Sequence, residues 1–549
     1  MKWKVAPKSS DDIVEQILIN RGIKTLEERE DFFNPKISDY EKDMQIPGIE
    51  KALERIKKAI EEKELIIVFG DYDVDGISAC AILYKSLTSI GAKVLPYIPH
   101  REKEGYGLSR QGLEFAKSSG AQVVITVDNG IVAIEQAKFA KTLGLDLIIT
   151  DHHLPLDKLP EAYAIVHSTK MCGAAVAWCL IKDSISKDLA KELLQFVAIA
   201  TVCDLIPLIG LGRAFVFEGL KLLNKTKNLG LIELINESGI KGEIGSFEIG
   251  YILGPRLNAI GRLEHAIDAL RLLCTKDLTK ARKLAKVLCE VNIQRQTLTK
   301  TAIEEAKLLI SKDKKIHVLF SKDWASGIIG LIAGKIAEEY SRPTIAISVG
   351  ETFSKGSARS VAGVNIVELI REFSDILVDV GGHPGAAGFS IETKHLAVFK
   401  SRIEKSVLSL PDGAEQILEV DALVDTNQLN KSLVESLQKF QPFGFKNPRP
   451  ILITYGVRIS DIKTVGQARL PKTGTVGQGK HLKFKVSPPV ILSGAQRSEG
   501  SIDCIAFNMG QLQGSLQKAH EIDLAYTPEI DSYNGFEKLQ LKIKDIKIK

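Results

Sequence analysis

The stretch 66-IIVFGDYDVDGISACAIL-83 decides the fold. An apolar run typical of a buried strand comes first, and an apolar, helix-like run follows Gly76. Between the two runs stand three aspartates at alternate positions, Asp71, Asp73 and Asp75. Alternate residues at an extended strand end face the same way, so we expect these carboxylates to share one side, with Gly76 allowing a tight turn into the helix.

The alternation of strand and helix continues along the chain. ELIIVFG, KVLPYIPH, QVVITVD and LDLIIT are strand-like, and helical patterns separate them. Continuous apolar strands separated by helices predict an α/β fold with a parallel sheet that is covered on both faces. We expect an N-terminal helical segment at 1–60, the parallel-sheet domain at 61–263, a connecting helix at 264–315, a second α/β domain at 316–410, a linker at 411–442 and a small antiparallel barrel at 443–549.

Composition limits the class of protein. Of 549 residues, 44% are hydrophobic and 26% are charged, which is typical of a soluble globular protein with several domains. No apolar run reaches the roughly 18 residues that span a bilayer, and the start of the chain lacks the apolar core of a secretory signal. The seven cysteines form no CxxC pair and are read as buried thiols, so we expect a reduced, cytoplasmic compartment.

Positive charge is concentrated at the C-terminal end. Residues 443–549 contain 16 Lys and Arg against 9 Asp and Glu, whereas the rest of the chain contains 57 against 59. A basic module on a nearly neutral body indicates a polyanionic partner; the ordinary alternative is a soluble basic face.

Further acids and a histidine pair follow other apolar runs. Asp128 comes after VVITV, His152 and His153 come after LDLIIT and Asp151, and Asp204 comes after FVAIATVC, which is read here as a strand. Ligands of open parallel sheets bind beyond the carboxyl ends of the strands, so we expect these groups to converge there. Clustered carboxylates repel one another unless cations lie among them. Two divalent cations fit this arrangement, and the imidazole ligands favour Mn²⁺ over Mg²⁺.

Each of these patterns alone has an ordinary structural explanation. A D-x-D sequence often caps a helix or forms a turn, a His-His pair is often structural, and Asp204 alone is typical of a helix cap. Their combination at successive strand ends is far more specific than any single pattern.

Together, these motifs resemble those of a known family. GDYDVDG, VDNG, TDHH and TVCDLIPL are similar to the motifs of the DHH phosphoesterase superfamily. Later motifs narrow the resemblance to the RecJ family, whose DHH domain is followed by a DHH-associated domain and an OB-fold. These motifs are GPRLNAIGR (254–262), WASGIIGLIAGKIAEEY (324–340), KGSARS (355–360), GGHPGAAGFS (381–390), PFGFKNPRP (442–450) and NGFEKLQLKIKDI (534–546).

The resemblance implies a single-strand-specific 5′→3′ DNA exonuclease that releases 5′-mononucleotides in repair and recombination. It places Asp73 and Asp128 on one metal ion, and Asp75, Asp128, His152 and Asp204 on the other. Asp71 then supports the cluster or, as an alternative, binds metal directly. His153 meets the scissile phosphate or orients the site.

The resemblance also implies residues that bind the substrate. Arg101, Arg262, Ser357 and Arg359 match phosphate-binding positions of the family, and their recognition of a terminal 5′ phosphate sets the polarity. His383, in the glycine-rich loop GGHPGAAG, contacts the scissile phosphate; the alternative is a tight structural turn with a buried imidazole. In the barrel, the candidates for contact with the strand are Lys483, Phe484, Lys485, Phe507 and Tyr526. The chain departs from the family pattern at His167-Ser168 and at Gly212, so the resemblance does not define the substrate channel at these positions.

Three other functions compete with this interpretation: a nuclease for short RNA or cyclic dinucleotides, a non-catalytic replication scaffold, and a pyrophosphatase. The basic C-terminal module argues against the first and third, and the complete set of metal ligands argues against the second. We expect a monomer that binds single-stranded DNA, with a helicase and a single-strand-binding protein as partners and no membrane association.

Overall fold

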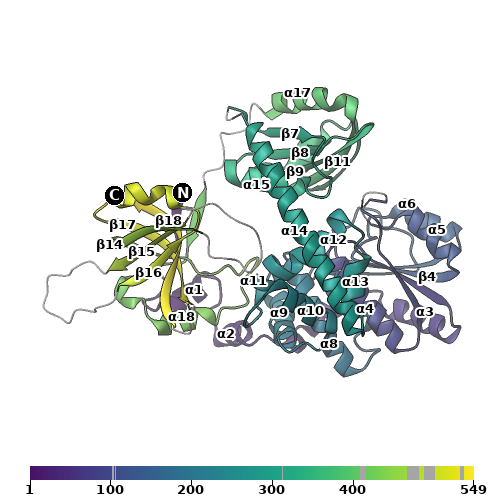
Figure 1. Cartoon of the computed structure of the whole chain (residues 1–549). Helices are drawn as coiled ribbons and strands as arrows, with labels where there is room; N and C mark the ends of the chain where they lie inside the picture. Colours follow the sequence, from purple (N-terminus) through teal and green to yellow (C-terminus); the bar gives the residue numbers. More distant parts are fainter. Residues whose placement is uncertain are drawn as a thin grey trace. The chain divides into compact units, whose positions relative to one another are not determined.

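The computed structural model describes residues 1–101, 104–105, 107–311, 313–407, 416–466, 481–487, 501–531 and 537–548. The chain forms two compact units (Figure 1). The larger unit contains Tyr40–Ile206 and Phe215–Ala414, and the smaller one contains Met1–Asp39, Pro207–Ala214 and Glu415–Lys549.

The larger unit begins with a parallel sheet of five strands in the order β3-β2-β4-β5-β6. Strand β2, which lies between β3 and β4, is apolar and inaccessible to solvent from Ile66 to Phe69, because helices cover both faces. Figure 1 shows α5 and α6 on one face and α3 and α4 on the other, so the predicted α/β fold is confirmed. The strands are β2 (Leu65–Phe69), β3 (Lys93–Tyr97), β4 (Ala121–Val127), β5 (Asp146–Asp151) and β6 (Ala164–His167); the helices are α3 (Ile49–Glu61), α4 (Val74–Ser89), α5 (Arg110–Ser118), α6 (Ile134–Thr142) and α7 (Gly173–Ile181).

A helical region follows this sheet and leads into the second α/β domain. Its last helix, α14, is 31 residues long and leads to strand β7 (Figure 1). The helices are α8 (Lys187–Cys203), α9 (Gly210–Leu223), α10 (Leu229–Ser238), α11 (Ser246–Glu248), the π-helix η2 (Ile249–Leu253), α12 (Gly254–Leu263), α13 (Ile267–Cys274) and α14 (Leu278–Leu308).

The second sheet has the strand order β10-β11-β9-β8-β7. Its β7–β8 pair is parallel and the other pairs are antiparallel, so the sheet is mixed. The elements are β7 (His317–Ser321), α15 (Ile329–Tyr340), β8 (Thr344–Ser348), β9 (Phe353–Arg359), α16 (Ile366–Arg371), β10 (Leu377–His383), β11 (Ala386–Glu392) and α17 (Leu396–Ser406).

The smaller unit is built around a six-stranded sheet in the order β13-β14-β15-β16-β18-β17, and a β14–β17 pairing closes five of these strands, all but β13, into a barrel. The predicted OB-type barrel is confirmed; β13–β14 and β16–β18 are parallel pairs within an otherwise antiparallel sheet. Residues 411–415 of the predicted linker and 534–536 of the NGFEKLQLKIKDI motif lie outside the described residues. The strands are β12 (Ile417–Val420), β13 (Ala422–Leu423), β14 (Leu452–Val465), β15 (His481–Ser487), β16 (Ile502–Ala506), β17 (Ile522–Asp531) and β18 (Lys538–Ile548).

The N-terminal segment belongs to this smaller unit. Strand β1 (Lys2–Val5) pairs in parallel with β12, and apolar residues of α1 (Ile13–Asn20) and α2 (Leu26–Phe33) join the barrel core with α18 (Lys431–Gln438).

Arg213 ties the three segments of the smaller unit together. Its guanidinium is 1% exposed and donates hydrogen bonds to the backbone carbonyls of Phe32, Phe440, Gln441 and Pro442. The guanidinium also lies 4.0 Å from the centre of the Phe32 ring.

No helix among the described residues is both long and apolar enough to cross a bilayer.

Candidate metal centre

The three aspartates of the first motif lie around the start of a helix. Strand β2 ends at Phe69, Asp73 is the N-cap of α4, and Asp75 lies in the first turn of that helix. The side chain of Asp73 accepts hydrogen bonds from the N–H groups of Asp75 (2.9 Å) and Gly76 (3.1 Å). The expected alternation along an extended strand end is therefore wrong, because the chain turns into a helix first. A Cβ atom at Gly76 would lie 2.6 Å from the backbone nitrogen of Asp71, so the turn requires glycine.

The N-terminus of α7 orients the Asp75 carboxylate. One oxygen accepts from the N–H of Gly173 and the other from the N–H of Ala174, both at 2.7 Å. Free N–H groups at a helix N-terminus attract negative charge. Asp75 is therefore fixed in orientation although it is only 2% exposed.

Asp128 and Asp204 come from different kinds of element. Asp128 follows β4 directly and adopts a left-handed backbone conformation, with φ of 63°, that aspartate and asparagine tolerate better than most residues. Asp204 is the C-cap of α8, so the run FVAIATVC, predicted as a strand, is helical instead. The run is the last part of a 17-residue helix whose N-terminus Ser186 caps.

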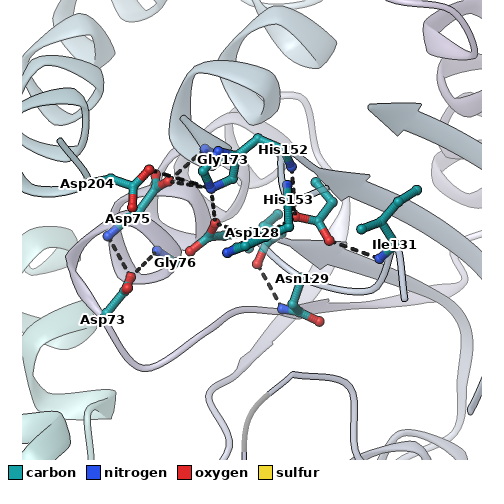
Figure 2. Close-up of polar contacts among 12 residues, drawn as sticks. Asp73, Asp75, Gly76, Asp128, Asn129, Ile131, His152, His153, Gly173 and Asp204 are labelled. Carbon is teal, nitrogen blue, oxygen red and sulfur yellow. Dashed lines mark hydrogen bonds and ion pairs between the residues drawn. The ribbon is translucent and has the colours of Figure 1, made fainter. Parts of the chain in front are cut away.

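The structure brings these side chains together around His152 (Figure 2). Its Nε2 atom lies 3.1 Å from Asp128, 3.6 Å from Asp75 and 3.6 Å from Asp204, in each case measured to a carboxylate oxygen. Among the described residues, three groups have ligand atoms within 4.8 Å of one another: Asp75, His152 and Asp204; Asp128, His152 and His153; and Asp71, Asp73 and Asp128.

Asp151 holds the second histidine and the loop around it. One of its oxygens accepts from the N–H groups of His152 (2.7 Å) and His153 (3.1 Å) and lies 2.8 Å from Nδ1 of His153. The other oxygen accepts from the N–H of Ile131 at 2.9 Å (Figure 2). Asp151 therefore fixes the direction of the His153 ring.

The raised pKa values of the clustered carboxylates indicate a binding site for a cation. Burial, followed by the charge of Asp73, raises the pKa of Asp75 to about 7. Burial, followed by the charges of Asp75 and Asp73, raises the pKa of Asp204 to about 8. Burial and neighbouring carboxylates also raise the pKa of Asp71 and of Asp128 well above the ordinary value. Such a cluster is stable in its charged form only when positive charge lies within it.

The two histidines differ in charge. Burial and the neighbouring His153 lower the pKa of His152 to about 4, so its ring is neutral near pH 7 and can bind a metal. Burial alone would lower the pKa of His153, but its hydrogen bond and ion pair with Asp151 raise the pKa to about 9. The donor set, carboxylate oxygens with a neutral imidazole, fits Mn²⁺ well and Mg²⁺ less well.

Three of the predicted phosphate-binding arginines lie near this centre. Burial and then the charge of Arg101 lower the pKa of Arg262 to about 10, and Asp73 and Arg359 also act on it electrostatically. Arg262 donates to the carbonyl of Gly327 at 3.1 Å. The guanidinium of Arg101 lies 4.9 Å from the centre of the Tyr72 ring, beside Asp73 in the sequence.

The other two predicted phosphate contacts, Ser357 and His383, lie on the second sheet, as Arg359 does. Ser357 and Arg359 share strand β9, where the Arg359 guanidinium lies 3.5 Å from the Ser357 hydroxyl. His383, at the end of β10, is exposed, and no contact among the described residues joins it to the metal centre.

The barrel residues divide into two groups. Phe484 and Tyr526 are 2% and 0% exposed, and the Tyr526 hydroxyl is hydrogen-bonded to Thr454, so these two candidates lie in the barrel core, which is the commoner place for a barrel aromatic. Phe507 is 41% exposed and packs edge-on against His481. Lys483 and Lys485 line a cavity of about 640 Å³ that two further lysines and three aspartates share.

Sequence reasoning did not give Asp151 a role, although it precedes the histidine pair that was chosen. Its place in the sequence could have indicated this role, since a carboxylate next to a candidate histidine often fixes the orientation of the histidine ring. The Gly173 and Ala174 N–H groups carry no side-chain signal, so only the fold reveals them.

Comparison with protein families agrees with this domain order. Residues 65–201 match the N-terminal domain of the DHH family, residues 313–408 match the DHHA1 domain, and residues 420–545 match the RecJ OB domain.

Characterised relatives and solved structures match along nearly the whole chain. The single-stranded-DNA-specific exonuclease RecJ of Bacillus subtilis is 33% identical over 99% of this chain and 70% of its own length. The protein of the same name from Escherichia coli is 29% identical over 98% of this chain and 96% of its own length. The crystal structure of RecJ in complex with Mn²⁺ from Thermus thermophilus is 26% identical and has a TM-score of 0.83, covering 100% of this chain and 79% of that one. The RecJ structure with Mg²⁺ from the same organism has a TM-score of 0.77. The chain therefore belongs to the RecJ family of DHH proteins.

Proposed function

We propose that this protein is a single-stranded-DNA-specific exonuclease that hydrolyses phosphodiester bonds from the 5′ end and releases 5′-mononucleotides. The observation that carries the proposal is the buried cluster in which Asp128 and His152 each belong to two of the three candidate ligand groups. Shared ligands of this kind suit a pair of cations. The relatives are named as single-stranded-DNA-specific exonucleases, which supports the substrate and the reaction class of this proposal.

The protein ligands divide between two ions in this proposal. Asp75, His152 and Asp204 hold one ion, Asp73 holds the other, and Asp128 bridges them. Asp71 lies within the same group as Asp73 and Asp128, which favours the alternative that it binds metal directly. When bound, the cations lower the pKa of a water molecule and stabilise the charge that develops on the phosphate.

The remaining groups position the DNA. His153, protonated near pH 7 and held by Asp151, directs positive charge toward the phosphate at the metal centre. Arg101, Arg262, Arg359 and Ser357 bind the terminal 5′ phosphate, which fixes the end at which cleavage begins. A helicase and a single-strand-binding protein, the protein partners expected from the sequence, remain predictions.

The test is digestion of end-labelled single-stranded DNA with Mn²⁺, with and without a 5′ phosphate, next to a dinucleotide and a duplex. We expect stepwise release of mononucleotides from the 5′ end of single strands and faster turnover of the phosphorylated substrate. Preference for dinucleotides, or digestion from the 3′ end, contradicts the proposal.

A further inference from the structure

The proposed phosphate-binding arginines continue onto the long helix α14. Arg262 lies close enough to Arg295, on that helix, for their charges to interact, and Arg295 interacts in turn with Arg256 on α12. None of these three guanidiniums, nor those of Arg101 and Arg359, forms an ion pair with a carboxylate in the part of the chain that the structure describes. Positive charges gathered without acidic partners indicate a polyanion.

A hydrogen bond to a buried neighbour holds the Arg295 side chain in place on α14. Its Nη2 atom donates to the side-chain oxygen of Asn292 at 3.0 Å, and Asn292 is 1% exposed. A buried, rigid residue one turn earlier on the same helix therefore holds the guanidinium in one direction. This differs from the surface arginine Arg282 of α14, which pairs with Glu233 and is 66% exposed.

Two polar atoms on this face of α14 are buried and without a hydrogen-bond partner among the described residues: Nε of Arg295 and Oγ1 of Thr299. The two residues are four apart, so they lie on the same face of the helix. Buried polar atoms in folded proteins are almost always hydrogen-bonded, so an unsatisfied donor and an unsatisfied hydroxyl on one face of the helix point to a ligand that supplies oxygen acceptors. A phosphate group has such acceptors, and a guanidinium binds it through two N–H groups.

We propose that Arg295 and Thr299 form a second phosphate site, which binds an internal phosphate of the single strand rather than its 5′ end. Arg256 supports the site electrostatically; its own guanidinium donates to the carbonyl of Ile252 at 2.7 Å and to the sulfur of Cys289 at 3.3 Å. The site extends the positive surface from the metal centre along the helix that connects the two α/β domains. The inference rests on the proposed function, since it takes single-stranded DNA to be the ligand.

The test measures binding and hydrolysis separately. Binding of a fluorescent 20-nucleotide single strand is followed by anisotropy in EDTA over a series of salt concentrations, for the unchanged protein and for Arg295→Ala, Thr299→Val and Arg282→Ala. We expect Arg295→Ala to weaken binding about tenfold and to reduce the slope of log K against log salt by about 0.7, the value for one lost phosphate contact on a single strand. Thr299→Val keeps the shape of the side chain and weakens binding by a smaller factor, whereas Arg282→Ala leaves both quantities unchanged.

The position of the site is tested with substrates of different length and end group. Arg295→Ala lowers kcat/KM equally for strands with and without a 5′ phosphate and leaves cleavage of a dinucleotide unaffected. The inference is overturned if Arg295→Ala and Arg282→Ala have equal salt slopes and both unfold at the same temperature as the unchanged protein. It is also overturned if Arg295→Ala lowers kcat/KM only for strands with a 5′ phosphate. If the unchanged protein binds the strand in EDTA but does not cleave it with Mn²⁺, the proposed function fails while the phosphate site stands.

Discussion

Metal affinity is expected to depend steeply on pH, because two of the candidate ligands carry protons near neutrality. Asp75 has a pKa of about 7 and Asp204 of about 8, both raised first by burial and then by neighbouring carboxylates. A carboxylate must lose its proton before it binds a metal, so metal and proton compete for the same atoms. His152 adds no such dependence above pH 6, because its pKa is lowered to about 4.

The size of the effect follows from these values. Between pH 8 and pH 6, protonation lowers the apparent affinity by about tenfold through Asp75 and by about fiftyfold through Asp204, so these two groups alone contribute about 500-fold. The raised pKa values of Asp71 and Asp128 act in the same direction. Carboxylates with ordinary pKa values near 4 would leave the affinity almost unchanged over this range.

The assay is titration of the metal-free protein with Mn²⁺ at pH 6, 7 and 8, followed calorimetrically in buffers with different ionisation enthalpies so that released protons are counted. Asp204→Asn is the matched control: it removes the contribution of Asp204, so the change in affinity between pH 8 and pH 6 should be about fiftyfold smaller than in the unchanged protein. An affinity that changes less than tenfold between pH 8 and pH 6 in the unchanged protein refutes the electrostatic argument.

Stability of the metal-free protein gives a second readout of the same groups. A carboxyl whose pKa is raised on folding holds its proton in the folded state after the unfolded chain has lost it. The free energy of unfolding should therefore fall as pH rises from about 5 to about 8, and Mn²⁺ should restore it at pH 8. Urea unfolding at the two pH values, with and without Mn²⁺, measures both changes.

Four substitutions test other parts of the structure. Asp128→Asn, which suits the positive φ at this position, should leave the circular dichroism spectrum unchanged but lower nuclease kcat/KM by at least about 1,000-fold; retention of most activity contradicts its bridging role. Arg359→Ala should reduce the preference for 5′-phosphorylated over unphosphorylated strands about tenfold, measured as the ratio of the two kcat/KM values, and an unchanged ratio places the end-binding site elsewhere. Asp151→Asn removes the main group that raises the pKa of His153, so that pKa should fall from about 9 toward 6.5 or below; a value still near 9 in an NMR titration of the imidazole shows that another group holds the proton. Arg213→Ala leaves buried carbonyls without their donor and should lower the free energy of unfolding by about 3–5 kcal/mol in urea, against less than about 0.5 kcal/mol for the surface control Arg282→Ala.

The parallel sheet and most of the metal cluster could be predicted because their signals are local. Strands β2, β4 and β5 are short apolar runs, and each is followed within a few residues by acids or histidines. Since parallel strands end at one edge, sequence position alone brings Asp128 and His152 together.

Other features could not be read from local patterns. FVAIATVC has the composition of a buried strand, and only its continuation from the cap at Ser186 makes it a helix. Strand β17 is buried on both faces from Ile522 to Pro528, so alternation could not separate a core position from a surface one; the Tyr526 hydroxyl is satisfied inside the barrel by Thr454. The role of Arg213 depends on carbonyls more than 180 positions away in either direction, which no window of sequence contains.

The smaller unit draws on both ends of the chain, and this has a consequence for biosynthesis. Ile17, Leu18 and Phe32 belong to a core whose other members come almost entirely from positions beyond 420. At ordinary translation rates the ribosome needs roughly twenty seconds to more than a minute to make the intervening residues. During that time the nascent amino-terminal helices have no barrel to cover their apolar side, whereas the larger unit is finished and can fold behind them. Premature termination between the end of the larger unit at Ala414 and the start of β14 would therefore leave a folded nuclease core whose leading segment exposes apolar side chains, a natural target for chaperones and proteases.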